Sequence, residues 1–171
     1  MEKMEKINNL KDLFTNQVRD IYTAEKKILS PFYSEIRNHA SSADLKETID
    51  QSKRECDNHI QRLNLVFEKL NLPLITTASE KSIGIENIIK EINNVVNRCE
   101  SKNVRDAAIV SYLQRINHYE IAIYGSLRTF AEELGHNDLA TTIQKSLDEE
   151  KKIDMKLTKL ATERINEKAI V

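Results

Sequence analysis

Apolar residues recur every three or four positions over most of this chain, which is the spacing of one face of an α-helix. The pattern predicts four long helices, over about residues 8–39, 43–70, 103–134 and 137–165, and a shorter helix over about 84–100. Residues 73–83 carry no such pattern and are expected to be irregular. Pro31 lies inside the first long helix, where we expect a kink.

Turn and capping residues mark the ends of these helices. A Ser-Ser-Ala-Asp segment at residues 41–44 predicts a short turn with an N-cap. Asn103, with Asp106 three residues later, is expected to begin the third long helix, and Gly135 is expected to end it. Asn137 is expected to cap the last helix. The short turns therefore join the long helices into two antiparallel pairs.

The connection between the second and third long helices runs from residue 71 to residue 103. A helix of ~30 residues is ~45 Å long, and this connection is long enough to return along the whole bundle. One long crossover is typical of ferritin-like bundles. We therefore predict a single all-α domain over residues 1–171, a ferritin-like antiparallel four-helix bundle with an extra short helix in the crossover.

The composition agrees with long helices and narrows the classes of function. The chain has 3 Gly, 2 Pro and 5% aromatic residues, and helices need few breakers. A net charge of −1 without a Lys/Arg-rich block predicts no nucleic-acid partner. No apolar run reaches the ~18 residues that span a membrane, and no secretory signal is visible. Cys56 and Cys99 form no metal-binding spacing, and reduced thiols indicate a cytoplasmic protein.

Glutamates interrupt the apolar faces of the long helices near the helix midpoints. Glu25, Glu120 and Glu150 lie in phase with the apolar residues around them. Glu55 lies at the edge of its apolar face, with His59 one turn further on. Antiparallel packing brings the midpoints of the helices to one level, so we expect these carboxylates to meet inside the bundle.

The spacing of the four glutamates is repeated. Thirty residues separate the first from the second and the third from the fourth, and the second pair lies 95 residues after the first. His59 follows the second glutamate by four residues, and Asp154 follows the fourth by four. The repeat predicts that two similar helix pairs build the bundle.

A buried cluster of this kind needs positive charge or protons. An unpaired carboxylate in an apolar core is strongly destabilising, so it must be paired or bind a cation. Carboxylates with one imidazole suit two metal ions ~3.5–4 Å apart, with iron as the first candidate and manganese or zinc as alternatives. The predicted metal ligands are Glu25, Glu55, His59, Glu120, Glu150 and Asp154. No catalytic residue separate from these ligands is predicted.

Other polar residues lie near the same level. Tyr22, Tyr119 and Tyr124 could hydrogen-bond a ligand carboxylate, carry an electron, or serve only for packing. His118 is two residues before Glu120 and so points ~200° away around the helix, which places it behind the ligands or on the surface.

Simpler interpretations of each acid remain open. Glu25 is next to Lys26 and Lys27, and Glu55 is near Arg54 and Arg62, so either glutamate could be an ordinary salt-bridged residue. The shared phase, level and spacing favour the metal cluster. No glycine-rich phosphate loop and no nucleophile–histidine arrangement is present in the sequence.

Four segments resemble one known family. The stretches LKDLF at residues 10–14, DIYTAEK at 20–26, HYEIAIYG at 118–125 and EEKKID at 149–154 are similar to the YciE/YciF-type ferritin-like family of bacterial stress proteins. The resemblance covers about residues 10–161. It implies a rubrerythrin-like bundle, a homodimer, and a dimetal site at the six predicted ligand positions.

The chain departs from the ferritin pattern at two points and from other members of the resembled family at a third. The second ligand on two helices lies four residues on instead of three, Asp154 stands where ferritins often have His, and Asn117 stands where family members often have Glu.

Two hypotheses of function follow from the sequence. In the first, a diiron-type carboxylate protein binds Fe(II) and oxidises it with O2 or peroxide, acting as a ferroxidase that protects against oxidative stress. In the second, the chain is a non-enzymatic, stress-associated helical dimer with a structural or vestigial metal site, and a protein partner is its target.

Overall fold

The computed structural model describes residues 6–73 and 82–170, and all regular structure in those ranges is helical. The elements are α1 (Leu10–Thr23), the π-helical turn η1 (Ala24–Leu29), α2 (Ser30–His39), α3 (Ala43–Lys69), α4 (Ile83–Arg98), α5 (Lys102–Glu133), α6 (Asn137–Leu160), η2 (Ala161–Ile165) and η3 (Glu167–Ala169). The four predicted long helices and the shorter one are all present.

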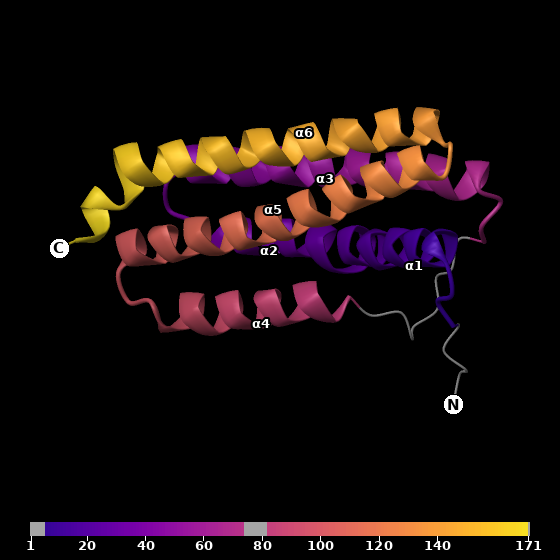
Figure 1. Cartoon of the computed structure of the whole chain (residues 1–171). Helices are drawn as coiled ribbons and strands as arrows, with labels where there is room; N and C mark the ends of the chain where they lie inside the picture. The colour runs from indigo at the N-terminus through magenta and orange to yellow at the C-terminus, as the bar shows by residue number, and fades with distance from the viewer. Residues whose placement is uncertain (1–5, 74–81, 171) are drawn as a thin grey trace.

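Four rods run side by side in the bundle (Figure 1). The first rod is α1, η1 and α2 in succession, and α3, α5 and α6 form the other three. Helix α5 packs along α6 and α1, while α3 packs along α6 and α2. Helix α4 lies outside the four rods, against α5 and η1, in the long crossover. The predicted fold class, a ferritin-like bundle with an extra crossover helix, is confirmed. Most of the segment predicted to be irregular lies outside the described residues.

The irregularity expected at Pro31 comes just before that residue, as the π-helical turn Ala24–Leu29. Proline has no N–H, and its ring crowds the carbonyl four residues earlier. A wider turn ahead of Pro31 relieves this crowding, and the Ser30 N–H bonds to the carbonyl of Glu25 across the turn. The turn also displaces the apolar face by one residue, so that Leu29 is buried and Ile28 is only half-buried.

Two of the predicted helix ends are confirmed and two are wrong. The Ser42 side chain caps α3 by accepting a hydrogen bond from the N–H of Leu45. Gly135 ends α5 in the left-handed region, with φ of +79°, which glycine adopts without strain. Asn137 does not cap α6; it is the first helical residue, and His136 occupies the cap position without a side-chain hydrogen bond.

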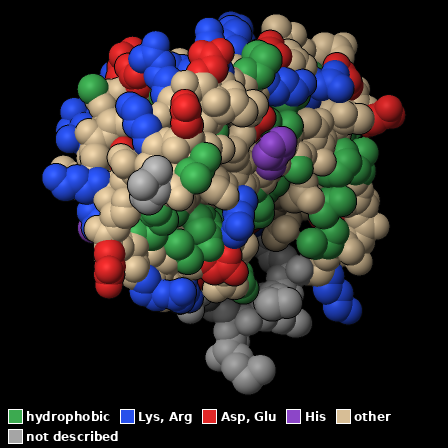
Figure 2. Space-filling model, turned by 90° about the vertical axis from the view of Figure 1, so that its left-hand side faces the viewer, with side chains coloured by type: hydrophobic (Ala, Val, Ile, Leu, Met, Phe, Trp, Pro, Cys, Tyr) green, Lys and Arg blue, Asp and Glu red, His purple; other side chains and the backbone are tan. Residues whose placement is uncertain are grey.

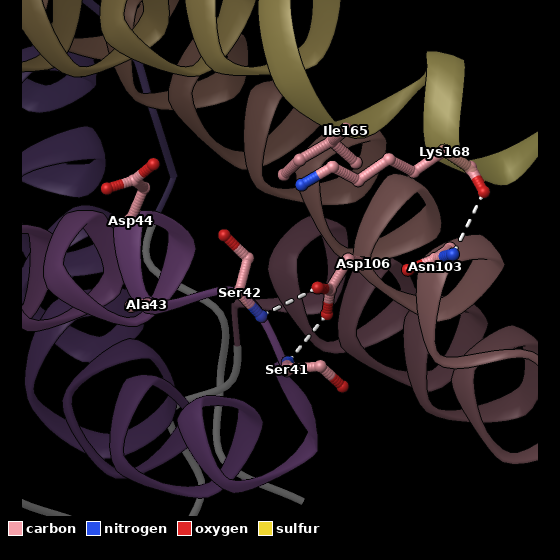
Figure 3. A pocket seen from close by; sticks show the side chains of 8 residues that line it. All are labelled: Ser41, Ser42, Ala43, Asp44, Asn103, Asp106, Ile165 and Lys168. Carbon is pink, nitrogen blue, oxygen red and sulfur yellow. Dashed lines mark hydrogen bonds between the residues drawn. The ribbon is translucent and has the colours of Figure 1, made fainter.

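The predicted start of the third long helix is also wrong, because Asp106 does not take part in capping its own helix. Helix α5 begins at Lys102 after Ser101, and the Asn103 side chain donates to the carbonyl of Lys168. Asp106 is 4% exposed and accepts hydrogen bonds from the N–H groups of Ser41 and Ser42, at 2.7 and 2.8 Å (Figure 3). Its carboxylate therefore attaches the α2–α3 turn to α5.

The surface at one end of the bundle is charged and mixed. Figure 2 looks onto the end of the bundle that carries the C-terminus, where Lys/Arg and Asp/Glu side chains alternate around hydrophobic ones. Within residues 6–73 and 82–170, no helix combines the length and the apolar character that crossing a membrane requires.

The contact of Asp106 with the α2–α3 turn gives a stability prediction. Asp106→Ala leaves two backbone donors without their charged acceptor and should lower the free energy of unfolding by about 2–3 kcal/mol, measured by urea denaturation. Asp50→Ala is the matched control, because it removes the half-exposed ion pair with Arg37 and should cost under about 1 kcal/mol. Equal losses in both variants would contradict this assignment.

Candidate metal centre

The buried face of the first rod is repeated in α5. Residues 95 positions apart are buried in both, as the sequence predicted. The matching pairs are Val18 and Leu113, Ile21 and Ile116, Glu25 and Glu120, and Leu29 and Tyr124. Glu25 and Glu120 therefore hold equivalent places in two facing rods.

The second helices of the two pairs match at 94 positions instead of 95, so the predicted pairing of Glu55 with Glu150 is wrong by one residue. The matching buried pairs are Ile49 and Ile143, Ser52 and Ser146, Cys56 and Glu150, His59 and Ile153, and Leu63 and Leu157. Glu55 thus corresponds to Glu149. Both are half-buried, and both lie on the seam between α3 and α6.

Three of the predicted ligands come together in the core. Glu25 of η1, His59 of α3 and Glu120 of α5 are all buried, and each offers a ligand atom within 4.8 Å of the others. Glu150 of α6 adjoins them, with its Oε1 3.7 Å from His59 Nδ1. All four rods therefore contribute to the cluster, and the Glu25–His59–Glu120 group could hold a metal ion.

The π-helical turn helps to position Glu25. Residues 21–25 are all buried, because α3 and α4 pack on different sides of this stretch and α5 lies along α1. The Cys56 thiol donates a hydrogen bond to the Glu25 carbonyl oxygen at 3.5 Å. The backbone of the turn is thus held from α3 as well as from within its own helix.

Two hydrogen bonds meet on one oxygen of Glu25. His59 Nδ1 donates to Oε1 at 2.9 Å, and the Tyr124 hydroxyl donates to the same atom at 2.6 Å. The second oxygen, Oε2, is buried without a hydrogen-bond partner, and so is Oε2 of Glu120. Buried acceptors without partners are rare in proteins and call for an explanation. A cation bound between these carboxylates would satisfy them, so the residues fit a metal.

His59 is held from its other side by residues that the sequence did not reveal as functional. Its Nε2 donates to Glu149 Oε2 at 3.0 Å. Glu149 in turn accepts two hydrogen bonds from Arg62, at 2.6 and 2.7 Å, and Arg62 also donates to Ser146. This arrangement points Nδ1 at the acids. A carboxylate behind a histidine in this way is typical of histidine metal ligands.

The charges in the group depend on one another. Burial raises the pKa of Glu120 well above its usual range, and the neighbouring carboxylates of Glu150 and Glu25 raise it further. Burial also raises the pKa of Glu150 to about 7, against the attraction of His59 and a hydrogen bond from Asn117 at 2.5 Å. Two of the carboxyl groups are therefore ready to hold protons when no cation is bound.

Glu25 and His59 form the complementary pair. Burial opposes the charge on both, but their mutual attraction outweighs it. The pKa of Glu25 is lowered, because His59 and the Tyr124 hydroxyl stabilise its carboxylate. The pKa of His59 is raised to about 10, because Glu25 and Glu149 stabilise its imidazolium form. When no metal is bound, the protonated His59 ring therefore supplies the positive charge that the buried carboxylates need.

Glu55 and Asp154 lie outside the three-residue group. Glu55 Oε1 accepts a hydrogen bond from Gln51 at 2.9 Å, and its Oε2 is buried without a partner. Burial raises the pKa of Glu55, and so does the negative charge of Glu149. Glu55 therefore interacts electrostatically with a residue that contacts the cluster. Asp154 faces Gln114 at 3.4 Å and His118 at 3.5 Å. Their assignment as ligands stays a prediction.

The flanking residues divide in the same way. Of the three predicted tyrosines, only Tyr124 bonds to the group. The Tyr22 hydroxyl accepts from Lys26, and the Tyr119 hydroxyl donates to Asp20. His118 is 67% exposed, in agreement with its predicted direction.

Tyr33, Cys56 and Asn117 also surround the group, although the sequence did not mark them as participants. Burial raises the pKa of the Tyr33 hydroxyl, as do the charges of Glu120 and Glu150. We call the Arg62–Glu149 pair that holds His59 the clamp. The spacing of His59 and Arg62, one helical turn apart, is the one feature of the sequence from which this clamp could have been predicted.

The fold and this cluster define a helical bundle with a carboxylate–histidine group buried at its centre. The chain belongs to the DUF892 family, a domain of unknown function, whose model matches residues 9–170. It is 35% identical over 164 residues to protein YciF of Escherichia coli strain K12, covering 95% of this chain and 96% of that protein.

Two similar structures agree with this assignment. The crystal structure of the E. coli stress protein YciF matches with a TM-score of 0.86 and 34% identity, over 94% of this chain and 99% of that chain. YcfI from Rhodopseudomonas palustris matches with a TM-score of 0.83 and 34% identity, over 91% and 97%. The resemblance noted in the sequence is confirmed.

The His59 environment gives a pH prediction for the metal-free protein. Because the folded-state pKa of about 10 lies above the ordinary imidazole value of about 6.5, protonated His59 stabilises the fold fully below pH ~6.5. This contribution is lost as the pH rises through about 10. The difference in unfolding free energy between the wild type and His59→Gln should therefore shrink steadily from pH 6.5 to 10.

NMR titration of the imidazole protons checks this prediction directly, with His59→Gln used to assign the resonance. A His59 signal that titrates near pH 6.5 would show that the carboxylates do not hold the proton.

Proposed function

We propose that this protein binds divalent metal ions at Glu25, His59 and Glu120, with iron as the first candidate, and that bound Fe(II) is oxidised by O2 or peroxide. The main support is that Glu25, His59 and Glu120, all buried, bring ligand atoms within 4.8 Å of one another, and that Oε2 of either carboxylate has no donor other than a proton shared among the acids. Carboxylate and imidazole ligands suit iron, and manganese or zinc remain alternatives.

Each residue has a defined task in this proposal. The carboxylates of Glu25 and Glu120 neutralise the cation, and His59 ligates through Nδ1 after it loses the proton there. Nε2 keeps its proton and its hydrogen bond to Glu149, so the ring does not turn. Glu150 adjoins the group and is the candidate ligand for a second ion.

Iron would supply the electron exchange between Fe(II) and Fe(III). The protein's own part is to exclude bulk water, since the three ligands are at most 1% exposed, and to manage protons. The Nδ1 proton of His59 is directed at Glu25, and Oε1 of Glu150 lies 3.7 Å from the same nitrogen; with a pKa of about 7, the Glu150 carboxylate can accept the proton that His59 gives up. Because the metal must displace the His59 proton, whose pKa is about 10, metal uptake should strengthen as the pH rises from about 7 towards 10.

A non-enzymatic bundle is the second candidate. Its support is that Glu25, His59 and Tyr124, and separately Asn117 and Glu150, already form hydrogen bonds with each other. Metal analysis of the purified protein together with oxygen consumption on adding Fe(II) distinguishes the two. Stoichiometric metal without oxygen consumption would assign a structural metal site.

The metal proposal predicts opposite effects of one substitution. Without metal, Glu120→Gln should be as stable as the wild type or more stable by about 1 kcal/mol, because a buried acid among acids is replaced by a neutral amide. With Fe(II), Mn(II) or Zn(II) at 100 times the dissociation constant, the wild type should gain about 2.7 kcal/mol and the variant much less.

Thermal and urea unfolding in a chelator and in added metal measure both effects, under anaerobic conditions for Fe(II). Glu163→Gln, an exposed glutamate of η2, is the control and should respond to metal as the wild type does. Equal metal stabilisation of wild type and Glu120→Gln would overturn the proposed site.

The clamp on His59 leads us to expect that Glu149, which is not itself a proposed ligand, affects the affinity for metal. Glu149→Gln should weaken metal binding about 10–100-fold, because the ring loses the charged acceptor that orients it. Asp148→Asn, the exposed neighbour, should leave the affinity unchanged within about threefold. Titration calorimetry gives both values, and equal affinities would show that the clamp serves only the fold.

A further inference from the structure

At the seam between α3 and α6, partly exposed charged side chains adjoin the buried cluster. Glu25 and His59 are fully buried and Glu120 is 1% exposed. Among the described charged side chains that contact or adjoin them, Glu149 is 22% exposed and Arg62 20%. Glu55 is half-buried at the same seam. A cation reaching the cluster from this side meets the carboxylates of Glu55 and Glu149 first.

The two seam acids are equivalent in the repeat but are held differently. The offset of 94 positions that matches Glu55 with Glu149 also matches Arg62 with Lys156. Arg62 of α3 binds Glu149 of α6 directly with two hydrogen bonds, and His59 adds a third. A bidentate pair of this kind is rigid.

The pseudo-equivalent residues Lys156 and Glu55 interact only indirectly, through Gln51. Lys156 Nζ donates to Gln51 Oε1 at 3.0 Å, and Gln51 Nε2 donates to Glu55 Oε1 at 2.9 Å. Lys156 thereby fixes which way the Gln51 amide points. The Glu55 carboxylate has this single neutral hydrogen bond, and its Oε2 is buried without a partner. Glu55 is therefore the seam acid that can change position at little cost.

We infer that Glu55 is the residue through which a divalent cation enters the cluster, and that Gln51 and Lys156 hold it at the α3–α6 seam until the cation arrives. This inference rests on the proposed metal-binding function. Under this inference Glu55 controls the rate of metal uptake and is not a permanent ligand. We call the Lys156–Gln51 pair the latch, because it holds Glu55 at the seam until the cation arrives.

Stopped-flow mixing of metal-free protein with Co(II) separates the rate of uptake from the final affinity. Glu55→Gln should slow association about tenfold, because a negative charge at the entrance attracts the cation. Gln51→Leu should speed association by about threefold or more, because Glu55 no longer has to leave a hydrogen bond. Both variants should keep the wild-type stoichiometry.

Matched controls isolate the latch from general charge effects. Lys156→Met and Lys159→Met each remove one positive charge from α6, but Lys159 is exposed, and the hydrogen bond to Gln51 Oε1 comes from Lys156. Only Lys156→Met should reproduce the faster uptake of Gln51→Leu. Gln61→Leu, on the exposed side of α3, should match the wild type.

The outcomes distinguish this inference from the function on which it rests. If the wild type takes up no Co(II), the metal-binding function fails and the entrance with it. If the wild type binds Co(II) but all variants associate at the wild-type rate, the entrance alone is wrong. If Glu55→Gln loses the metal as Glu25→Gln does, Glu55 is a permanent ligand and the inference is overturned.

Discussion

The burial of several carboxylates in one apolar core is the constraint on which the rest of this structure depends. Each rod of the bundle brings one ligand-type side chain to the same level, and their charges cannot all persist there without compensation. In the metal-free protein His59 supplies one positive charge, and the raised pKa values of Glu120 and Glu150 let these two groups take up protons. A buried cluster whose carboxyl groups are stable only when some of them are protonated is well suited to release those protons and bind a cation.

Much of the surrounding architecture serves this compensation. The π-helical turn before Pro31 positions Glu25, with the Cys56 thiol holding its backbone. The Arg62–Glu149 pair orients His59 from behind. Partly exposed charged side chains, Arg62 and Glu149 among them, then lie at the seam between α3 and α6. The same few contacts therefore determine the charge of the centre and hold a partly exposed acid beside it.

The sequence predicted the bundle, its crossover and the equivalence of Glu25 and Glu120, because helical periodicity and residue spacing can be read directly from the sequence. It could not show that α3 and α6 match at 94 positions, since a slip of one residue rotates a helical position by about 100°. That slip replaced the expected pair of Glu55 and Glu150 by Glu55 and Glu149. Asp106 misled for a related reason, because a local capping pattern was satisfied instead by the distant turn at Ser41 and Ser42.

Anomalous diffraction at the iron absorption edge, from crystals grown with Fe(II), tests the central claim most directly. We expect a strong peak among the carboxylates of Glu25 and Glu120 and Nδ1 of His59. Iron peaks confined to surface carboxylates, with the buried group still joined by its own hydrogen bonds, would contradict it.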